Sequence, residues 1–229
     1  MDDAPLDNPI WSALNGRHRD LADGSDGVMR YPADIAPFLG IADADRAPGS
    51  DLAATLEALV PAQDTVYLLG VAPCPPTGWR LRAYRPLAQM ISTEPMPVPD
   101  GPPIIPLSQT HHADVLALTA LVYPHYFRVR TMTLGRYFGM YVDGRLAAMI
   151  GERLGADCFQ EVSAICTHPD FNGRGYARRM TAMLSNDILA QGRIPFLHVS
   201  YDNARAKALY DSLGYRLRGD IGFWSLRRP

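Results

Sequence analysis

The chain has 229 residues, of which 47% are hydrophobic and 20% charged, a composition typical of soluble globular proteins. This length is enough for one large domain or two small ones. The formal net charge of −2 gives no overall attraction to nucleic acid or to an anionic membrane surface. No apolar run reaches the roughly 18 residues that a membrane span requires. We therefore expect no nucleic-acid partner and no membrane partner.

The cysteines indicate a reducing compartment. Cys74, Cys158 and Cys166 are odd in number and lack the Cys-x-x-Cys spacing of zinc and redox motifs. The start, Met-Asp-Asp-Ala, lacks the basic and apolar regions of a signal peptide. The sequence therefore predicts reduced thiols, no metal site and a cytoplasmic location, and no pattern indicates an oligomeric state.

Residues 1–100 are predicted to form a small α/β unit of unknown role. Their apolar spacing predicts a short helix from Asn8, an amphipathic helix over residues 51–60, and strands over residues 65–71 and 79–85. Residues 93–106 contain six prolines, which predict a stiff extended linker. We therefore expect an N-terminal α/β extension over residues 1–100 and a second domain over residues 104–229.

The second domain alternates helical and strand patterns. Helices are predicted over residues 110–122 and 126–134, followed by strands over residues 136–143 and 145–152. Asp143-Gly144 between these strands predicts a hairpin, because a type I′ turn needs two residues with positive φ. A strand (158–167), a helix from Tyr176, a strand (195–201), a helix (203–212) and a final hairpin or strand (215–226) complete a mixed α/β pattern.

Asn172-Gly173-Arg174-Gly175 joins a predicted strand to the helix that follows. Glycines let the backbone approach a ligand closely, and a helix directs its free N–H groups into such a turn, so the segment is typical of a phosphate site. A Walker A loop is excluded because the single lysine, Lys207, lies elsewhere, and Arg178 replaces the third glycine of a dinucleotide fingerprint. A nucleotide-binding protein that uses the same turn remains an alternative.

Two segments resemble the GNAT superfamily of N-acyltransferases. Residues 172–177 are similar to its acyl-CoA loop, Gln/Arg-x-x-Gly-x-Gly/Ala: Gly175 and Ala177 fit, whereas Asn172 departs from the usual Gln or Arg. Residues 203–215 are similar to its second signature, Asn-x-x-Ala-x-x-x-Tyr-x-x-x-Gly-Phe/Tyr. The resemblance covers about residues 104–226 and is closest to the glycine-N-acyltransferase-like branch. It implies a GNAT-type fold, with a central mixed, mostly antiparallel sheet flanked by helices, in addition to the N-terminal extension.

The resemblance also implies a reaction, the direct transfer of an acetyl or other acyl group from acetyl-CoA to the amine of an unidentified acceptor. A small-molecule amine or an amino acid is the favoured acceptor. The alternative is a non-catalytic module that binds acyl-CoA. The residues implied to hold the cofactor are Ile165, Cys166 and Thr167 on the strand, Asn172, Gly173, Arg174, Gly175, Tyr176 and Ala177 at the turn, and Asn203. Arg178 and Arg179 are interpreted as solvated helix positions.

Two residues are predicted to be catalytic. Glu161 begins the strand, on the same side as Ser163, Ile165 and Thr167 by simple alternation, and is predicted to be a general base with a raised pKa. A water molecule as base, with Glu161 facing solvent, is the alternative. Tyr210 occupies the family position of the acid that protonates the CoA sulfur, and a core tyrosine is the competing interpretation. By analogy with related folds, four residues between the first two helices are predicted to line the acceptor pocket: Tyr123, His125, Tyr126 and Phe127.

Overall fold

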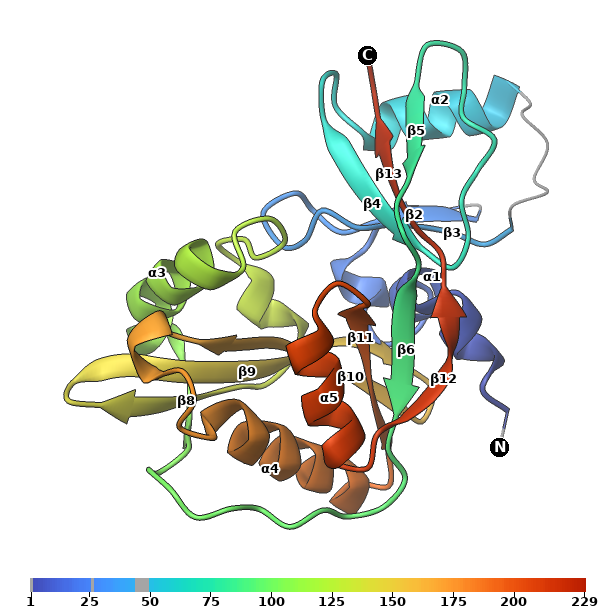
Figure 1. Cartoon of the computed structure of the whole chain (residues 1–229). Coiled ribbons are helices and arrows are strands. Elements are labelled where there is room, and N and C mark those ends of the chain that lie inside the picture. Colours follow the sequence, from blue (N-terminus) through green and yellow to red (C-terminus); the bar gives the residue numbers. More distant parts are fainter. Residues whose placement is uncertain (1, 26, 44–49) are drawn as a thin grey trace.

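The structure, a computed structural model, describes residues 2–25, 27–43 and 50–229. A seven-stranded sheet with the order β12-β6-β11-β10-β9-β8-β7 forms the body of the molecule (Figure 1). Its neighbouring strands are antiparallel except for β10 and β11. The predicted mixed α/β class with a mostly antiparallel central sheet is therefore confirmed. Its strands are β6 (Leu87–Ile91), β7 (Ile105–Pro106), β8 (Tyr137–Val142), β9 (Arg145–Ala156), β10 (Phe159–Thr167), β11 (Ile194–Ser200) and β12 (Arg216–Ile221).

Helices cover both faces of this sheet. On one face, α4 (Tyr176–Ala190) packs over β8, β9 and β10, and α5 (Ala204–Ser212) packs beside it over β6 and β11. On the other face lie α1 (Pro9–Leu14) and α3 (His112–Val122). The remaining helical elements are α2 (Ser50–Leu59) and the short 3-10 helices η1 (Ala4–Asp7), η2 (Arg19–Leu21), η3 (Gln109–His111), η4 (Thr131–Leu134) and η5 (Pro169–Phe171). None of the helices in the described ranges is long and apolar enough to cross a bilayer.

The helix predicted over residues 126–134 is wrong. Only the 3-10 helix η4 forms there, at Thr131–Leu134. The Thr131 hydroxyl accepts a hydrogen bond from the Arg128 N–H at 2.6 Å and donates to the Ile35 carbonyl at 2.7 Å. These side-chain bonds satisfy backbone groups that a helix would otherwise use, and they fasten the loop to the N-terminal segment.

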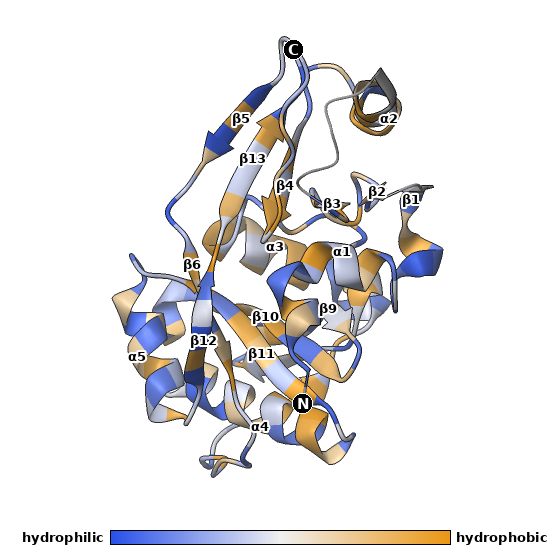
Figure 2. Ribbon diagram, turned by 90° about the vertical axis from the view of Figure 1, so that its right-hand side faces the viewer, coloured by the Kyte–Doolittle hydropathy of each residue, from blue (hydrophilic) through white to orange (hydrophobic). Residues whose placement is uncertain are grey.

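Two smaller sheets lie above the body in Figure 1. One consists of β1 (Asp23–Ser25), β2 (Val28–Arg30) and β3 (Leu39–Ile41). The other has the order β4-β13-β5 and consists of β4 (Thr65–Leu69), β13 (Phe223–Arg227) and β5 (Arg80–Ala83). Figure 2 shows β5 as largely hydrophilic, as expected of an edge strand that pairs on one side only.

The chain passes between the large sheet and the β4-β13-β5 sheet twice. β5 is followed by β6, which lies between β12 and β11 in the large sheet. β12 is followed by β13, which pairs with β4 and β5. Of the predicted final hairpin or strand, the hairpin is therefore wrong, because strands form there but join different sheets. The predicted boundary near residue 100 does not separate the sheets either, since β6 comes from residues 1–100.

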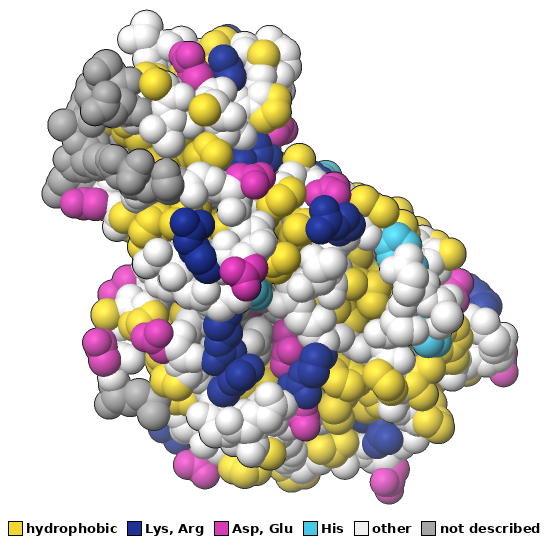
Figure 3. Space-filling view, turned by 180° about the vertical axis from the view of Figure 1, so that it is seen from behind, with side chains coloured by type: hydrophobic (Ala, Val, Ile, Leu, Met, Phe, Trp, Pro, Cys, Tyr) yellow, Lys and Arg dark blue, Asp and Glu magenta, His cyan; other side chains and the backbone are white. Residues whose placement is uncertain are grey.

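Charged side chains of both signs lie intermixed on the face shown in Figure 3. Exposed ion pairs among the described residues include Arg130–Asp34 and Arg145–Asp170. Such a surface fits the small net charge and offers no extended area of one sign on that face.

His18 connects the N-terminal segment to the rest of the body. Its Nε2 lies 3.0 Å from the Leu134 carbonyl, which can only accept, so Nε2 carries the proton. Nδ1 therefore accepts from the Tyr31 hydroxyl at 2.7 Å. Each nitrogen of the neutral ring therefore has a hydrogen-bond partner. Burial lowers the pKa of His18.

We predict that His18 makes the protein less stable in mild acid. Its folded pKa lies below the unfolded value of about 6.5, so the unfolded chain binds more protons, and the free energy of unfolding falls as the pH drops below that value. His18→Gln should reduce the decrease in the free energy of unfolding between pH 7 and pH 5, measured by urea unfolding. His125→Gln, at an exposed position, is the control. The prediction would be contradicted if the free energy of unfolding of His18→Gln fell with pH as steeply as that of the wild type.

Candidate active site

The site forms where β10 and β11 separate. These parallel strands pair only from Phe159 with Ile194 to Glu161 with Phe196, although β10 continues to Thr167 and β11 to Ser200. Two pockets of about 520 and 490 Å³ lie beside the diverging strands. We call the first the polar-aromatic pocket, because it contains Glu161 and several tyrosines, and the second the glycine-turn pocket, because it contains residues 172–175.

Two bulges between β9 and β10 shape this region. Ala164 and Ile165 face the single β9 residue Ile150, and Ala164 has a φ of +50°. Such a bulge bends and twists the strand. Val162 and Ile165 consequently both pack on the α4 face. Adjacent strand residues point to opposite faces, so Glu161 faces away from Val162. The predicted alternation that placed Glu161 and Ile165 on one side is therefore wrong.

The glycine turn has the geometry of an anion site. Gly173 and Gly175 have φ values of +79° and +77°, which disfavour other residues. Gly175 is the N-cap of α4, and the first bond within the helix runs from the Arg179 N–H to the Gly175 carbonyl. The three preceding N–H groups, those of residues 176–178, therefore have no partner within the helix and carry the positive end of its dipole.

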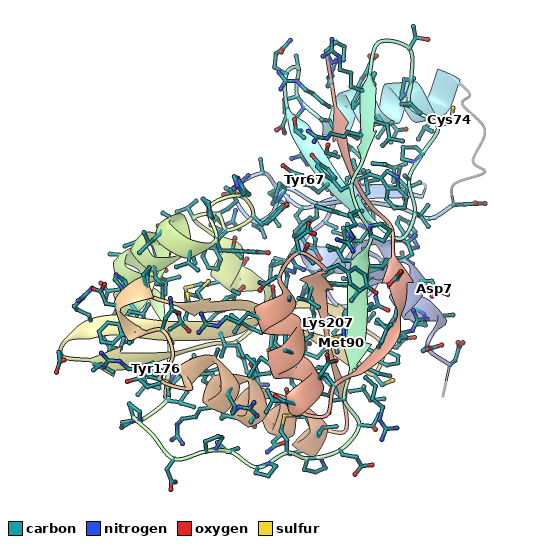
Figure 4. The ribbon with its side chains drawn as sticks, in the orientation of Figure 1. Asp7, Tyr67, Cys74, Met90, Tyr176 and Lys207 are labelled. Carbon is teal, nitrogen blue, oxygen red and sulfur yellow. The ribbon has the colours of Figure 1, made fainter. Side chains whose placement is uncertain are left out.

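The glycine-turn pocket brings together nine of the ten residues predicted to hold the cofactor: Ile165, Thr167, Asn172, Gly173, Arg174, Gly175, Tyr176, Ala177 and Asn203. Figure 4 labels Tyr176 at the start of α4. Asn203 caps α5, accepting from the Ala206 N–H at 3.1 Å. The tenth residue, Cys166, is 2% exposed and lines the polar-aromatic pocket instead.

Three arginines line the glycine-turn pocket. They are Arg174, Arg178 and Arg205, and no Asp or Glu occurs among its described lining residues. Arg178, interpreted from the sequence as a solvated helix position, is half-buried beside this pocket and donates to the Ser212 hydroxyl. Arg179 points elsewhere and donates to the Pro99 carbonyl, which fixes the proline-rich linker. The pocket is suited to a ligand with several negative charges.

Tyr210 lies on the wall that separates the two pockets. It lines both of them, together with Val122, Ile165, Asn203 and Ala206. Tyr210 is 7% exposed, and burial raises the pKa of its phenol, with smaller contributions from Cys166 and Tyr123. Among the described residues none hydrogen-bonds its hydroxyl. The group stays protonated over the physiological pH range and is free to donate.

Glu161 is held by four hydrogen-bond donors. Oε2 accepts from Arg153 Nε at 2.7 Å and from the Leu154 N–H at 3.1 Å. Oε1 accepts from Arg153 Nη2 at 2.6 Å and from His198 Nδ1 at 2.7 Å. The other of the two bulges lies between Gln160 and Val162 of β10. There Arg153 and Leu154 of β9 both face Glu161, which produces this arrangement. Nearly all the accepting capacity of the carboxylate is used.

The predicted raised pKa of Glu161 is wrong. Burial of this side chain, which is 1% exposed, raises its pKa, but the charge and hydrogen bonds of Arg153 and the bond from His198 outweigh burial and lower the pKa to about 2. Its role as a base stays a prediction. In this arrangement Glu161 must release a donor before it takes a proton.

A row of hydrogen-bonded side chains determines which ring nitrogen of His198 donates to Glu161. Arg218 donates to Gln89 Oε1 at 2.9 Å, so the Gln89 amide nitrogen faces Leu6 O at 2.9 Å and His198 Nε2 at 3.0 Å. An amide nitrogen only donates, so Nε2 accepts and Nδ1 carries the proton given to Glu161. The sequence offered no signal for these contacts, since Gln89 lies 109 residues from His198 and 129 from Arg218.

The polar-aromatic pocket contains two of the four loop residues predicted to face the acceptor. Tyr123 and Tyr126 line it, whereas His125 and Phe127 line neither pocket. Residues 1–100 also contribute to this pocket, including Phe38 and Tyr84, which no motif in the sequence indicated. Among the described residues, no cluster of three His, Cys, Asp or Glu side chains is arranged to hold a metal ion.

The fold and the two pockets together define a mixed α/β protein with a cleft suited to a polyanionic ligand beside an aromatic pocket, and known proteins of this fold indicate its class. The FR47-like protein family matches residues 137–225. A GNAT-family structure from Novosphingobium aromaticivorans DSM 12444 is 36% identical, with a TM-score of 0.87, and the match covers 99% of this chain and 100% of that one. The chain therefore belongs to the GNAT family.

More distant structures support the fold alone. A GCN5-related N-acetyltransferase from Kribbella flavida is 14% identical with a TM-score of 0.64, covering 100% of this chain and 96% of that one. A GCN5-related N-acetyltransferase-like protein from Streptococcus suis is 16% identical with a TM-score of 0.58, covering 99% and 94%. No curated protein matches the chain.

We predict that the Arg153–Glu161 pair stabilises the fold only as a pair. Arg153→Met leaves a buried carboxylate without its cation and should lower the free energy of unfolding by about 3–5 kcal/mol. Arg153→Met combined with Glu161→Gln should recover part of this loss, as measured by urea unfolding. In the wild type, the stabilisation is present above pH ~4.5 and is lost as the pH falls toward the folded pKa of about 2.

Arg130→Met is the matched control for this experiment. Arg130 pairs with Asp34 at 3.1 Å, but their side chains are 52% and 43% exposed. Solvent screens such a pair, so the change should be much smaller. A double variant no more stable than Arg153→Met alone would show that the buried charge is not the cause.

Proposed function

We propose that the protein transfers an acetyl group, or another acyl group, from acetyl-CoA to the amine of an acceptor by direct attack. The observation that carries this proposal is the meeting of the two pockets at Tyr210. One pocket has the arginines and free helix N–H groups that a CoA pyrophosphate needs, and the other is free for an acceptor. A thioester in the glycine-turn pocket would present its carbonyl at the shared wall.

The strand geometry supports a place for the pantetheine arm. Beyond Glu161, β10 no longer pairs with β11, and the bulge at Ala164 and Ile165 interrupts its pairing with β9. Buried backbone N–H and C=O groups need hydrogen-bond partners, and the amides of a pantetheine arm along β10 would supply them. Ile165, Cys166 and Thr167 are the residues proposed for this contact.

Tyr210 is proposed as the acid. The amine nitrogen forms a bond to the thioester carbonyl carbon, the carbon–sulfur bond breaks, and the thiolate takes a proton from the Tyr210 hydroxyl. We propose a water molecule as the acceptor of the amine proton. Glu161 then contributes by holding Arg153 and His198 in place, since its four donors occupy it.

A small-molecule amine is the proposed acceptor, because about 520 Å³ is a usual volume for such a site. Assignment to the glycine-N-acyltransferase-like branch rests on the two loop motifs and is part of the proposal, as is the cytoplasmic location.

We predict that acetyl-CoA and CoA raise the melting temperature whereas ATP and NAD do not. A ligand at about a hundred times its dissociation constant adds roughly 2.7 kcal/mol, or about 5–10 °C for a chain of this length. Thermal denaturation with each ligand measures the effect. A shift with ATP or NAD but not with CoA would favour the nucleotide-binding alternative.

We predict that Tyr210→Phe lowers kcat about 10²-fold or more without changing the melting temperature, because its hydroxyl has no partner among the described residues. Tyr215→Phe is the matched control. That buried hydroxyl lies 2.7 Å from the Ser185 hydroxyl, so its loss should cost about 1–3 kcal/mol of stability and leave kcat nearly unchanged. CoA thiol release measures kcat. Unchanged turnover in Tyr210→Phe would remove Tyr210 as the acid and favour a non-catalytic role.

A further inference from the structure

Aromatic rings from distant parts of the chain form one wall of the polar-aromatic pocket. They belong to Phe38, Tyr84, Tyr123, Tyr126 and Phe223. All but Phe38 are partly exposed, although the rings of core aromatic residues are normally covered. Exposed aromatic surface that gathers in a concave site marks a place where a ligand covers it.

These rings hold one another in position. The ring centroids of Tyr84 and Phe223 lie 4.9 Å apart, and those of Phe38 and Tyr126 lie 6.2 Å apart. The ring centroid of Tyr67 lies 5.1 Å from that of Tyr126 and 5.8 Å from that of Phe223, but Tyr67 does not line the pocket. Figure 4 shows Tyr67 where β4 meets the body of the molecule. The aromatic wall is therefore preorganised, so a ligand that stacks on it has little ordering of side chains to oppose binding.

Every charge that lines the pocket already has a partner. Glu161 pairs with Arg153 at 2.6 Å, and Asp202 pairs with Arg85 at 2.7 Å. Among the described residues that line the pocket, none offers an unpaired carboxylate for a second ammonium group or an unpaired cation for a carboxylate. A polyamine or an amino acid would place a permanent charge there without a counterion. A monoamine avoids this cost, because its one ammonium must lose its proton before it attacks.

We propose that the acceptor is a primary monoamine with an aromatic or bulky apolar body. This inference rests on the proposed acyl transfer and names the substrate class of that site. The body packs against Tyr84, Tyr126 and Phe223, and the amine lies toward the shared wall at Ile165 and Tyr210. Attack forms the carbon–nitrogen bond of a neutral amide, and CoA leaves as the thiol with the proton from Tyr210.

The first test compares acceptors with the full-length protein and acetyl-CoA, following release of the CoA thiol. The probes are 2-phenylethylamine and tryptamine, set against n-propylamine, spermidine, glycine and an alanine-initiated peptide. We expect kcat/KM for the two aromatic amines to exceed that of every other probe by about tenfold or more, the factor expected from one or two ring contacts.

The second test uses matched variants. Tyr126→Leu should raise KM for 2-phenylethylamine by about threefold to tenfold relative to KM for n-propylamine. Phe138→Leu removes a half-buried ring that lines neither pocket and packs with the α4 cluster instead, so it should leave this ratio unchanged. Melting temperatures of both variants separate lost contacts with the amine from lost stability.

The outcomes distinguish this inference from the proposed function. If spermidine, glycine or the peptide has the highest kcat/KM, the acceptor class is wrong and acyl transfer stands. An equal change of the KM ratio in Phe138→Leu and Tyr126→Leu also overturns the aromatic wall as the binding surface. If no probe is acetylated and acetyl-CoA does not raise the melting temperature, both the inference and the proposed function fail.

Discussion

The structure depends on the separation of two parallel strands. β10 and β11 pair for three residues each and then diverge, which leaves backbone groups of a central strand without their usual partners. Such an opening is costly unless something fills it, because buried N–H and C=O groups need hydrogen bonds. Two bulges between β9 and β10 lie at this divergence, and both pockets lie along it. The proposed cofactor and acceptor would therefore meet where the sheet is irregular.

A buried ionic network holds this opening in place. Glu161 is the last β10 residue paired with β11, and its carboxylate binds Arg153 of β9 and His198 of β11. Gln89 of β6 and Arg218 of β12 extend the network to the sheet edge. A buried carboxylate is tolerated only when it is paired, so five neighbouring strands are held in register around one charge. The same donors lower the pKa of Glu161, which supports the proposal that a water molecule is the base and that Glu161 positions its neighbours.

The first hundred residues contribute to the large sheet and to the polar-aromatic pocket. β6 fills a place inside the large sheet, and Phe38 and Tyr84 supply part of the aromatic wall. The GNAT-like motifs, by contrast, gather at the glycine-turn pocket. The first hundred residues therefore contribute part of the proposed acceptor surface, whereas the residues proposed for the cofactor all come from the rest of the chain.

What the sequence determined is local. The Asp143-Gly144 turn has the positive φ values, +52° and +74°, that its residues predicted, and the glycine turn and α4 follow where backbone freedom and apolar spacing placed them. These features depend on neighbouring residues. The tertiary structure alone decided that β12 and β13 join different sheets, that His198 meets Glu161, and that Arg153 lowers the pKa of Glu161. Strand pairing and buried charge depend on residues far apart in the chain, about which periodicity and turn residues carry no information.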